Sequence, residues 1–171
     1  MTRTYHYVGP QDVRARAAGH AAGAIVLKAA DLLAWAKAFG LAAGRGEAIP
    51  ATFVVDAEGR LRVADRRSEH VECAGGGGDV LSAGEMFFAI DGCDVRVEEV
   101  SNQSTGYCPE SESWPAVAEA LERAGIEHPG GFTTVCVFRR CEACGERSIV
   151  KDGWFQCDVC GAKLPVDWNF A

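Results

Sequence analysis

Two segments, Thr52-Phe-Val-Val-Asp56 and Arg60-Leu-Arg-Val-Ala64, joined by Ala-Glu-Gly, decide the fold of this chain of 171 residues. Both segments are rich in residues that favour strands, and Gly59 can adopt the left-handed conformation of a tight turn. In the second segment, arginines alternate with Leu61 and Val63, so one face of that strand meets water. The sequence therefore predicts an antiparallel hairpin over residues 52–64.

Patterns on both sides of this hairpin extend the sheet and add helices. Residues 80–90 and 95–100 predict a second hairpin around an Asp-Gly turn. Brief helical patterns fill residues 10–19, 31–39 and 113–124, each ending before or at a glycine. Within residues 31–39, Leu32, Trp35 and Phe39 form one apolar stripe, and residues 133–138 read as another strand. We expect an α+β fold with a mostly antiparallel sheet and two or three helices.

The C-terminal part of the chain carries a metal-binding cysteine pattern. Cys141-Glu-Ala-Cys144 and Cys157-Asp-Val-Cys160 are separated by twelve residues. Two such pairs at this separation let four thiolates meet tetrahedrally around one Zn²⁺. Because four thiolates leave no open coordination position, we expect a structural zinc ribbon and not a catalytic metal.

No linker separates this ribbon from the preceding strand, so we expect it to pack on the rest of the chain. The predicted division is an α+β body over residues 1–138 and a zinc ribbon with its C-terminal tail over residues 139–171. The tail contains Trp168 and Phe170 and is too apolar to lie free in water. We therefore expect it to dock on the body.

Charge and cysteine content restrict the partners. The formal net charge is -7, and residues 139–171 contain equal numbers of acidic and basic side chains, so the body carries the whole excess. A nucleic-acid partner is therefore disfavoured, although Arg139, Arg140, Arg147 and Lys151 offer one weak possibility on the ribbon. The sequence has no membrane-spanning run and no apolar secretory leader. Cysteines in metal spacing favour the reducing cytoplasm.

The richest polar stretch in the body is Ser101-Asn-Gln-Ser-Thr-Gly-Tyr-Cys-Pro109. It lies between a predicted strand and a predicted helix, where a loop can present side chains to a ligand. Asn102, Gln103, Ser104 and Thr105 are the candidate ligand-binding residues, with Tyr107 as a candidate catalytic group. A hydrogen-bonded turn that caps the helix is the alternative interpretation.

Two residues upstream complete the candidate site. His70 is a candidate general acid or base, and Glu85 lies among apolar strand residues that would raise its pKa. Gly84 beside it indicates a strand position where another backbone comes close. The alternatives are an exposed loop histidine and a carboxylate on the wet face of the hairpin.

The same residues resemble a known family. Ala83-Gly-Glu85 followed by Ser104-Thr-Gly-Tyr-Cys-Pro109, after His70, is similar in order to a segment of plant IQ-motif calmodulin-binding proteins and their bacterial relatives. The resemblance spans residues 66–128 and implies a shared piece of fold. The family motif Ser-Gly-His-Tyr-Arg-Pro has its histidine at the position of Gly106. No counterpart of the calmodulin-binding IQ element is found.

Two functions follow from these features. The first is an enzyme or small-ligand binder that uses a pocket within residues 70–109. The second is a protein–protein interaction module that uses the zinc ribbon with Trp168 and Phe170.

Overall fold

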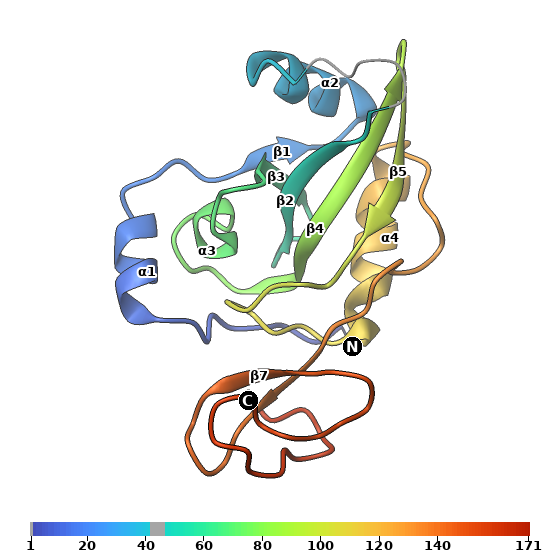
Figure 1. The fold of residues 1–171 in the computed structure, drawn as a ribbon. Coiled ribbons are helices and arrows are strands. Elements are labelled where there is room, and N and C mark those ends of the chain that lie inside the picture. Colours follow the sequence, from blue (N-terminus) through green and yellow to red (C-terminus); the bar gives the residue numbers. More distant parts are fainter. Residues whose placement is uncertain (1, 42–46) are drawn as a thin grey trace.

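The hairpin predicted over residues 52–64 lies at the centre of a five-stranded antiparallel sheet in the computed structural model, which describes residues 2–41 and 47–171 (Figure 1). The helices are α1 (Gln11–Ala17), α2 (Ala29–Ala38), α3 (His70–Cys73) and α4 (Trp114–Arg123), with the short 3-10 helix η1 (Ser111–Ser113). The strands are β1 (Ala24–Val26), β2 (Ile49–Asp56), β3 (Leu61–Asp65), β4 (Val80–Asp91), β5 (Asp94–Val100), β6 (Val137–Arg140) and β7 (Arg147–Val150).

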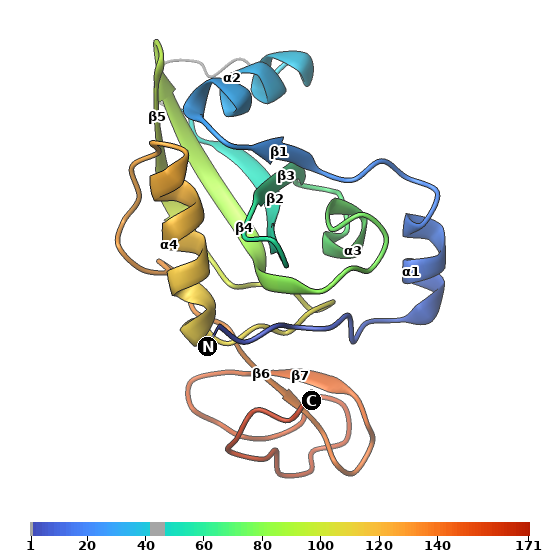
Figure 2. The same ribbon diagram turned by 180° about the vertical axis from the view of Figure 1, so that it is seen from behind.

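The sheet order is β1-β3-β2-β4-β5, and every neighbouring pair is antiparallel. Both predicted hairpins are confirmed as β2–β3 and β4–β5. Phe53 pairs with Val63 on one side and with Gly84 on the other, which fixes the register of the three central strands. The small sheet β6–β7 forms the C-terminal ribbon below this body (Figures 1 and 2).

Helices cover the two faces of the sheet differently. On one face, α2 and α4 bury Leu32, Trp35, Val117 and Leu121 against the sheet in the main hydrophobic core. On the other face, α3 contributes Cys73 to a smaller cluster. Figure 2 shows α4 and α3 on opposite sides of the sheet. The chain is therefore an α+β unit with its largest core between the sheet and α2 and α4.

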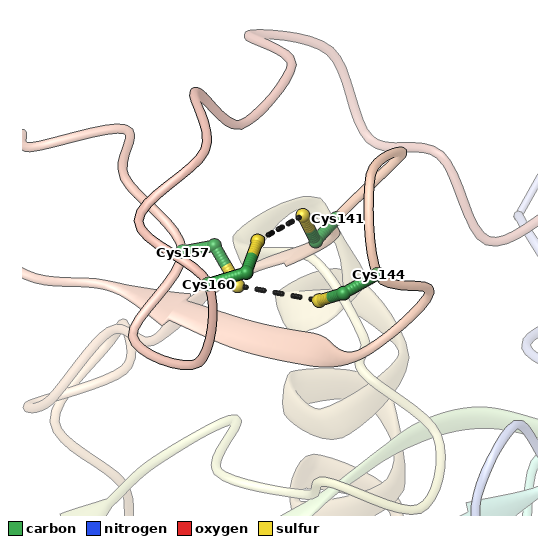
Figure 3. A group of neighbouring side chains, drawn as sticks. All are labelled: Cys141, Cys144, Cys157 and Cys160. Carbon is green, nitrogen blue, oxygen red and sulfur yellow. Dashed lines mark hydrogen bonds between the residues drawn. The ribbon is translucent and has the colours of Figure 1, made fainter.

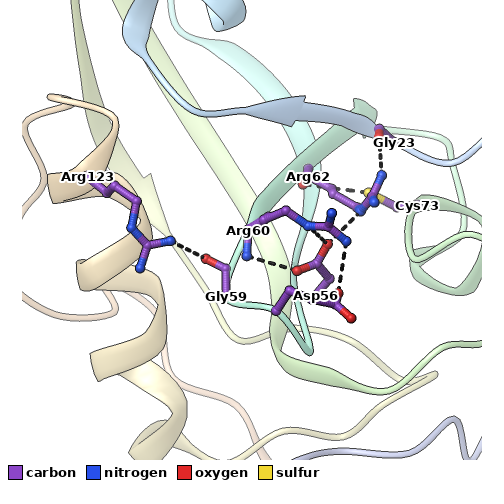
Figure 4. A network of polar contacts seen from close by, with 8 residues as sticks. Gly23, Asp56, Gly59, Arg60, Arg62, Cys73 and Arg123 are labelled. Carbon is purple, nitrogen blue, oxygen red and sulfur yellow. Dashed lines mark hydrogen bonds and ion pairs between the residues drawn. The ribbon is translucent and has the colours of Figure 1, made fainter.

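A polar network fixes the central turn (Figure 4). The Asp56 carboxylate accepts hydrogen bonds from the Arg60 backbone at 2.9 Å, from Arg60 Nε at 2.8 Å and from Arg62 Nε at 2.9 Å. Burial alone would raise the pKa of Asp56, but these hydrogen bonds lower it. The Arg123 guanidinium donates to the carbonyl of Gly59 at 3.0 Å and so ties α4 to the same turn.

Three details differ from the sequence prediction. The four-residue helix α3 was not expected, because one turn carries no helical periodicity. Phe39 is 55% exposed and not part of the buried stripe, since α2 ends at Ala38. Residues 133–136 do not form the predicted strand, because their backbone groups bond to Val100 and to the side chain of Asn102. Within the described ranges, the helices are too short or too polar to cross a membrane.

Candidate metal centre and candidate ligand site

The four ribbon cysteines converge on one point (Figure 3). Cys141 and Cys160 place their Sγ atoms 3.6 Å apart, and Cys144 and Cys157 place theirs 3.7 Å apart. All four sulfur atoms lie within 4.8 Å of one another. A tetrahedral site with metal–sulfur bonds of about 2.3 Å has its sulfurs about 3.8 Å apart, so this arrangement fits a metal ion. A disulfide would need about 2.05 Å, and all eight cysteines of the chain are free.

Two similar turns position these cysteines. The Gly145 amide donates to the carbonyl of Cys141 at 2.8 Å, and the Gly161 amide donates to the carbonyl of Cys157 at 2.9 Å. Both glycines have positive φ, 78° and 76°, which residues with a Cβ rarely adopt. Each turn thus directs its two thiols to the same side, as the sequence pattern predicts.

Hydrogen bonds to sulfur favour the thiolate form of one ligand. Ser148 Oγ donates to Cys157 Sγ at 3.5 Å, and the Val159 amide donates to it at 3.4 Å. The Ser148 hydroxyl and neighbouring amides lower the pKa of Cys157 to about 6. Ser148 was not predicted from the sequence, since only the β6–β7 pairing brings it beside the cysteines.

The ribbon and its tail are tied to each other and to the body. Asn169 Oδ1 accepts from the Arg140 amide and Asn169 Nδ2 donates to the Arg140 carbonyl, both at 2.8 Å. Trp168 Nε1 donates to the carbonyl of Cys108 at 2.8 Å, and the Trp168 ring meets the Tyr5 ring edge-on at 5.7 Å. Phe170 is only 6% exposed. The tail therefore docks on the body, and its two aromatic rings use most of their surface within the chain.

Four basic side chains of the ribbon are also engaged within the chain. Arg139 donates to the carbonyl of Val166, Arg140 to that of Gly145 and Arg147 to that of Thr105, while Lys151 pairs with Asp158. Each of these four side chains therefore has a partner within the chain, and the expectation that nucleic acid is not a partner stays a prediction.

His70 contacts the backbone of β4 one residue before Glu85. His70 Nε2 is 2.9 Å from the carbonyl of Gly84, the residue before Glu85. Because a carbonyl only accepts, Nε2 carries the proton and Nδ1 keeps its lone pair. Burial lowers the pKa of His70 to about 4, so its ring is neutral near pH 7. Glu85 lies two residues after Ala83 on β4, so it shares the sheet face covered by α3.

Glu85 lines a small hollow of about 100 Å³ with Gln103. Glu99 and the hydroxyl-bearing residues Ser101, Thr133 and Thr134 also line it. The side chains around the hollow are mainly polar, and two of them are acidic. The arrangement can accept hydrogen bonds from a small polar molecule.

The remaining candidate residues have other surroundings. Tyr107 and Asn102 are fully buried, and Ser104 is 1% exposed, whereas Thr105 is exposed. The Tyr107 hydroxyl donates to the carbonyl of Gly78 at 2.8 Å, and burial raises the pKa of Tyr107. Ser104 Oγ has no hydrogen-bond partner within the described part of the chain.

Asn102 acts as a brace between two segments. Its Nδ2 donates to the carbonyls of Pro109 and Cys136 at 2.8 Å, and its Oδ1 accepts from the Cys136 amide at 2.7 Å. Both amide protons are thus used inside the protein. The sequence signal of a polar residue in a loop does not distinguish such a brace from a ligand contact.

Gly106, the position of the family histidine, packs against another aromatic residue. A Cβ atom at Gly106 would lie 2.9 Å from Tyr7 Cε2, so a side chain there requires Tyr7 to move. No family model matches the chain, and searches of curated proteins and of solved structures found no match either. The resemblance of residues 66–128 to plant IQ-motif proteins has no support from these comparisons and stays a prediction.

Proposed function

We propose that Cys141, Cys144, Cys157 and Cys160 bind one Zn²⁺ and that this ion has a structural role. The sulfur separations of 3.6 and 3.7 Å carry the proposal, since they match the edge of a tetrahedral zinc site. Zinc prefers four thiolates in this geometry, and iron is the main competitor. Four protein ligands leave no position for a substrate, so the ion stabilises the ribbon and takes no part in a reaction.

Metal analysis of protein purified without chelator tests the proposal. We expect about one zinc and negligible iron per chain. Cys144→Ser should lower the zinc content and destabilise the ribbon, because metal binding contributes folding free energy. Cys93→Ser is the matched control, since Cys93 is exposed and lies outside the cluster. Metal-free protein, or iron in place of zinc, would contradict the proposal.

A second proposal concerns the body, where a small polar ligand would bind beside Glu85 and Gln103, with His70 as a neighbouring base. The hollow lined by Glu85 and Gln103 supports it. His70 Nε2 donates to the carbonyl before Glu85, so Nδ1 keeps the lone pair that a base needs. Asn102, Ser104, Thr105 and Tyr107 would shape the surrounding loop. A thermal-shift screen of small amines and alcohols tests this, with Glu85→Gln as the variant and Glu98→Gln as the control. A ligand that stabilises wild type and both variants equally would remove the proposal.

A protein partner is the alternative use of the ribbon. Trp154 is 73% exposed and Val159 is 67% exposed, so these side chains, and not the docked rings of Trp168 and Phe170, would meet the partner. The eight free thiols are compatible with the reducing cytoplasm, which we propose as the location.

A further inference from the structure

The turn formed by residues 104–108 has an unusual backbone. Cys108 has a φ of 47°, a left-handed conformation that residues other than glycine rarely adopt. The Cys108 amide donates to the carbonyl of Ser104 at 2.7 Å and closes the turn. Cys108 is fully buried, and burial raises the pKa of its thiol to about 12. Such a conformation persists only when its surroundings hold it.

The ribbon supplies part of what holds this turn. Arg147, the first residue of β7, donates to the carbonyl of Thr105, and Trp168 in the tail donates to the carbonyl of Cys108. Phe138 and Phe170 pack with Cys108 in one apolar cluster. The C-terminal segment thus supplies donors to two carbonyls of this turn, those of Thr105 and Cys108, and apolar contacts to the Cys108 side chain.

The tail is connected in turn to the cysteine cluster. Asn169 pairs through both its side-chain polar atoms with the backbone of Arg140, the residue before Cys141. Arg139 donates to the carbonyl of Val166. A change in β6 at the cluster therefore reaches Trp168 through a short series of hydrogen bonds.

The main core of the body does not depend on this connection. Its buried members all precede residue 127, and none comes from the ribbon or the tail. Cys73 is an internal reference within the body. It is as fully buried as Cys108, and burial raises the pKa of its thiol to the same value of about 12. Its Sγ is 3.7 Å from the carbonyl of Arg62 on β3. Its apolar cluster also includes Tyr107, and Trp168 packs against that cluster from the tail.

We propose that the metal-loaded ribbon acts as a clamp on residues 104–108, so that loss of the metal releases this turn and exposes Cys108 while the sheet stays folded. The inference rests on the proposed structural metal. Metal binding and turn closure are then coupled equilibria, and each favours the other. Release of the metal should therefore increase the reactivity of the Cys108 thiol, which the closed turn shields from solvent.

Alkylation by N-ethylmaleimide, followed residue by residue by mass spectrometry, tests the clamp on the full chain. Metal content and metal release are measured in the same samples. When a chelator removes the metal, we expect the labelling rate of Cys108 to rise about tenfold or more, since labelling follows the population of the open turn. The labelling rate of Cys73 should change less than about twofold, because the body remains closed.

The outcomes separate the two proposals. A protein that never contains metal would overturn the proposed zinc site and the clamp with it. Measured metal release with an unchanged Cys108 rate would overturn the clamp alone. Equal acceleration of Cys108 and Cys73 would also overturn it, because that result means global unfolding.

A substitution in the connection gives a second test with the metal bound. Trp168→Phe keeps an aromatic ring but removes the Nε1 donor to Cys108. We expect its metal content to be unchanged and the Cys108 labelling rate to rise about threefold to tenfold, the effect of one lost hydrogen bond. Trp154→Phe changes an exposed indole of the same ribbon and should leave the rate unaltered. Equal rates in the two variants would contradict the role of Trp168.

Discussion

Gly84→Ala should be among the most damaging single substitutions in this chain. A Cβ atom at Gly84 would lie 1.9 Å from the carbonyl oxygen of Ser101 and 2.8 Å from its carbonyl carbon. Both are backbone atoms, so no side-chain rotation relieves the clash. The Ser101 segment must move by more than about 1 Å to restore ordinary contact distances. That movement breaks the hydrogen bond from the Ser101 amide to the carbonyl of Glu85, which is 2.9 Å long.

The expected cost combines two effects. Overpacking a buried site costs about 1–3 kcal/mol, and a buried backbone hydrogen bond left unmade adds about 1–3 kcal/mol. We therefore expect Gly84→Ala to lower the free energy of unfolding by about 2–6 kcal/mol. In urea, with a slope of about 2 kcal/mol per M, the midpoint falls by roughly 2 M.

Urea unfolding of metal-loaded protein, followed by circular dichroism, measures this cost. Gly131→Ala is the control, because no heavy atom lies within 4 Å of a Cβ at that position. Its effect should stay below about 0.5 kcal/mol. If the free energies of unfolding of Gly84→Ala and Gly131→Ala differ by less than about 1 kcal/mol, the close approach of the two backbones does not exclude a side chain at position 84, and the reasoning is refuted.

Two further predictions concern His70 and Asn102. Folding lowers the pKa of His70 from 6.5 to about 4. Between these two pH values only the unfolded chain binds the proton. The free energy of unfolding should therefore fall as the pH drops from 6.5 to 4, by up to about 3 kcal/mol. His70→Gln keeps an N–H donor and should remove this part of the pH dependence in urea titrations; an identical profile for both proteins would contradict the buried neutral ring. Asn102→Asp replaces both amide donors with a carboxylate and should lower the free energy of unfolding by more than about 3 kcal/mol. Gln103→Glu makes the same charge change at an exposed position and should have little effect on it. A small effect of Asn102→Asp in thermal unfolding would argue against the brace.

The parts of the fold that could be predicted are those encoded by local patterns. Alternating residues and a turn glycine predict β2–β3, and the two cysteine pairs predict their own convergence, because each turn is built by five adjacent residues. Helix α3 and the start of β6 could not be predicted in the same way. Their boundaries depend on partners distant in sequence, such as Val100 and Asn102 for residues 133–136.

The polar loop shows why residue type alone does not predict a site. Asn102, Ser104 and Tyr107 have the chemistry expected of ligand-binding residues, yet the structure buries all three. Asn102 and Tyr107 form hydrogen bonds with backbone carbonyls that no regular ladder satisfies. An irregular turn beneath a docked ribbon leaves such carbonyls without strand or helix partners, and buried carbonyls need donors. Polar residues therefore concentrate here for a structural reason. Nδ1 of His70 keeps its lone pair and Glu85 lines the small hollow, so these two groups remain the candidates of the proposed ligand site.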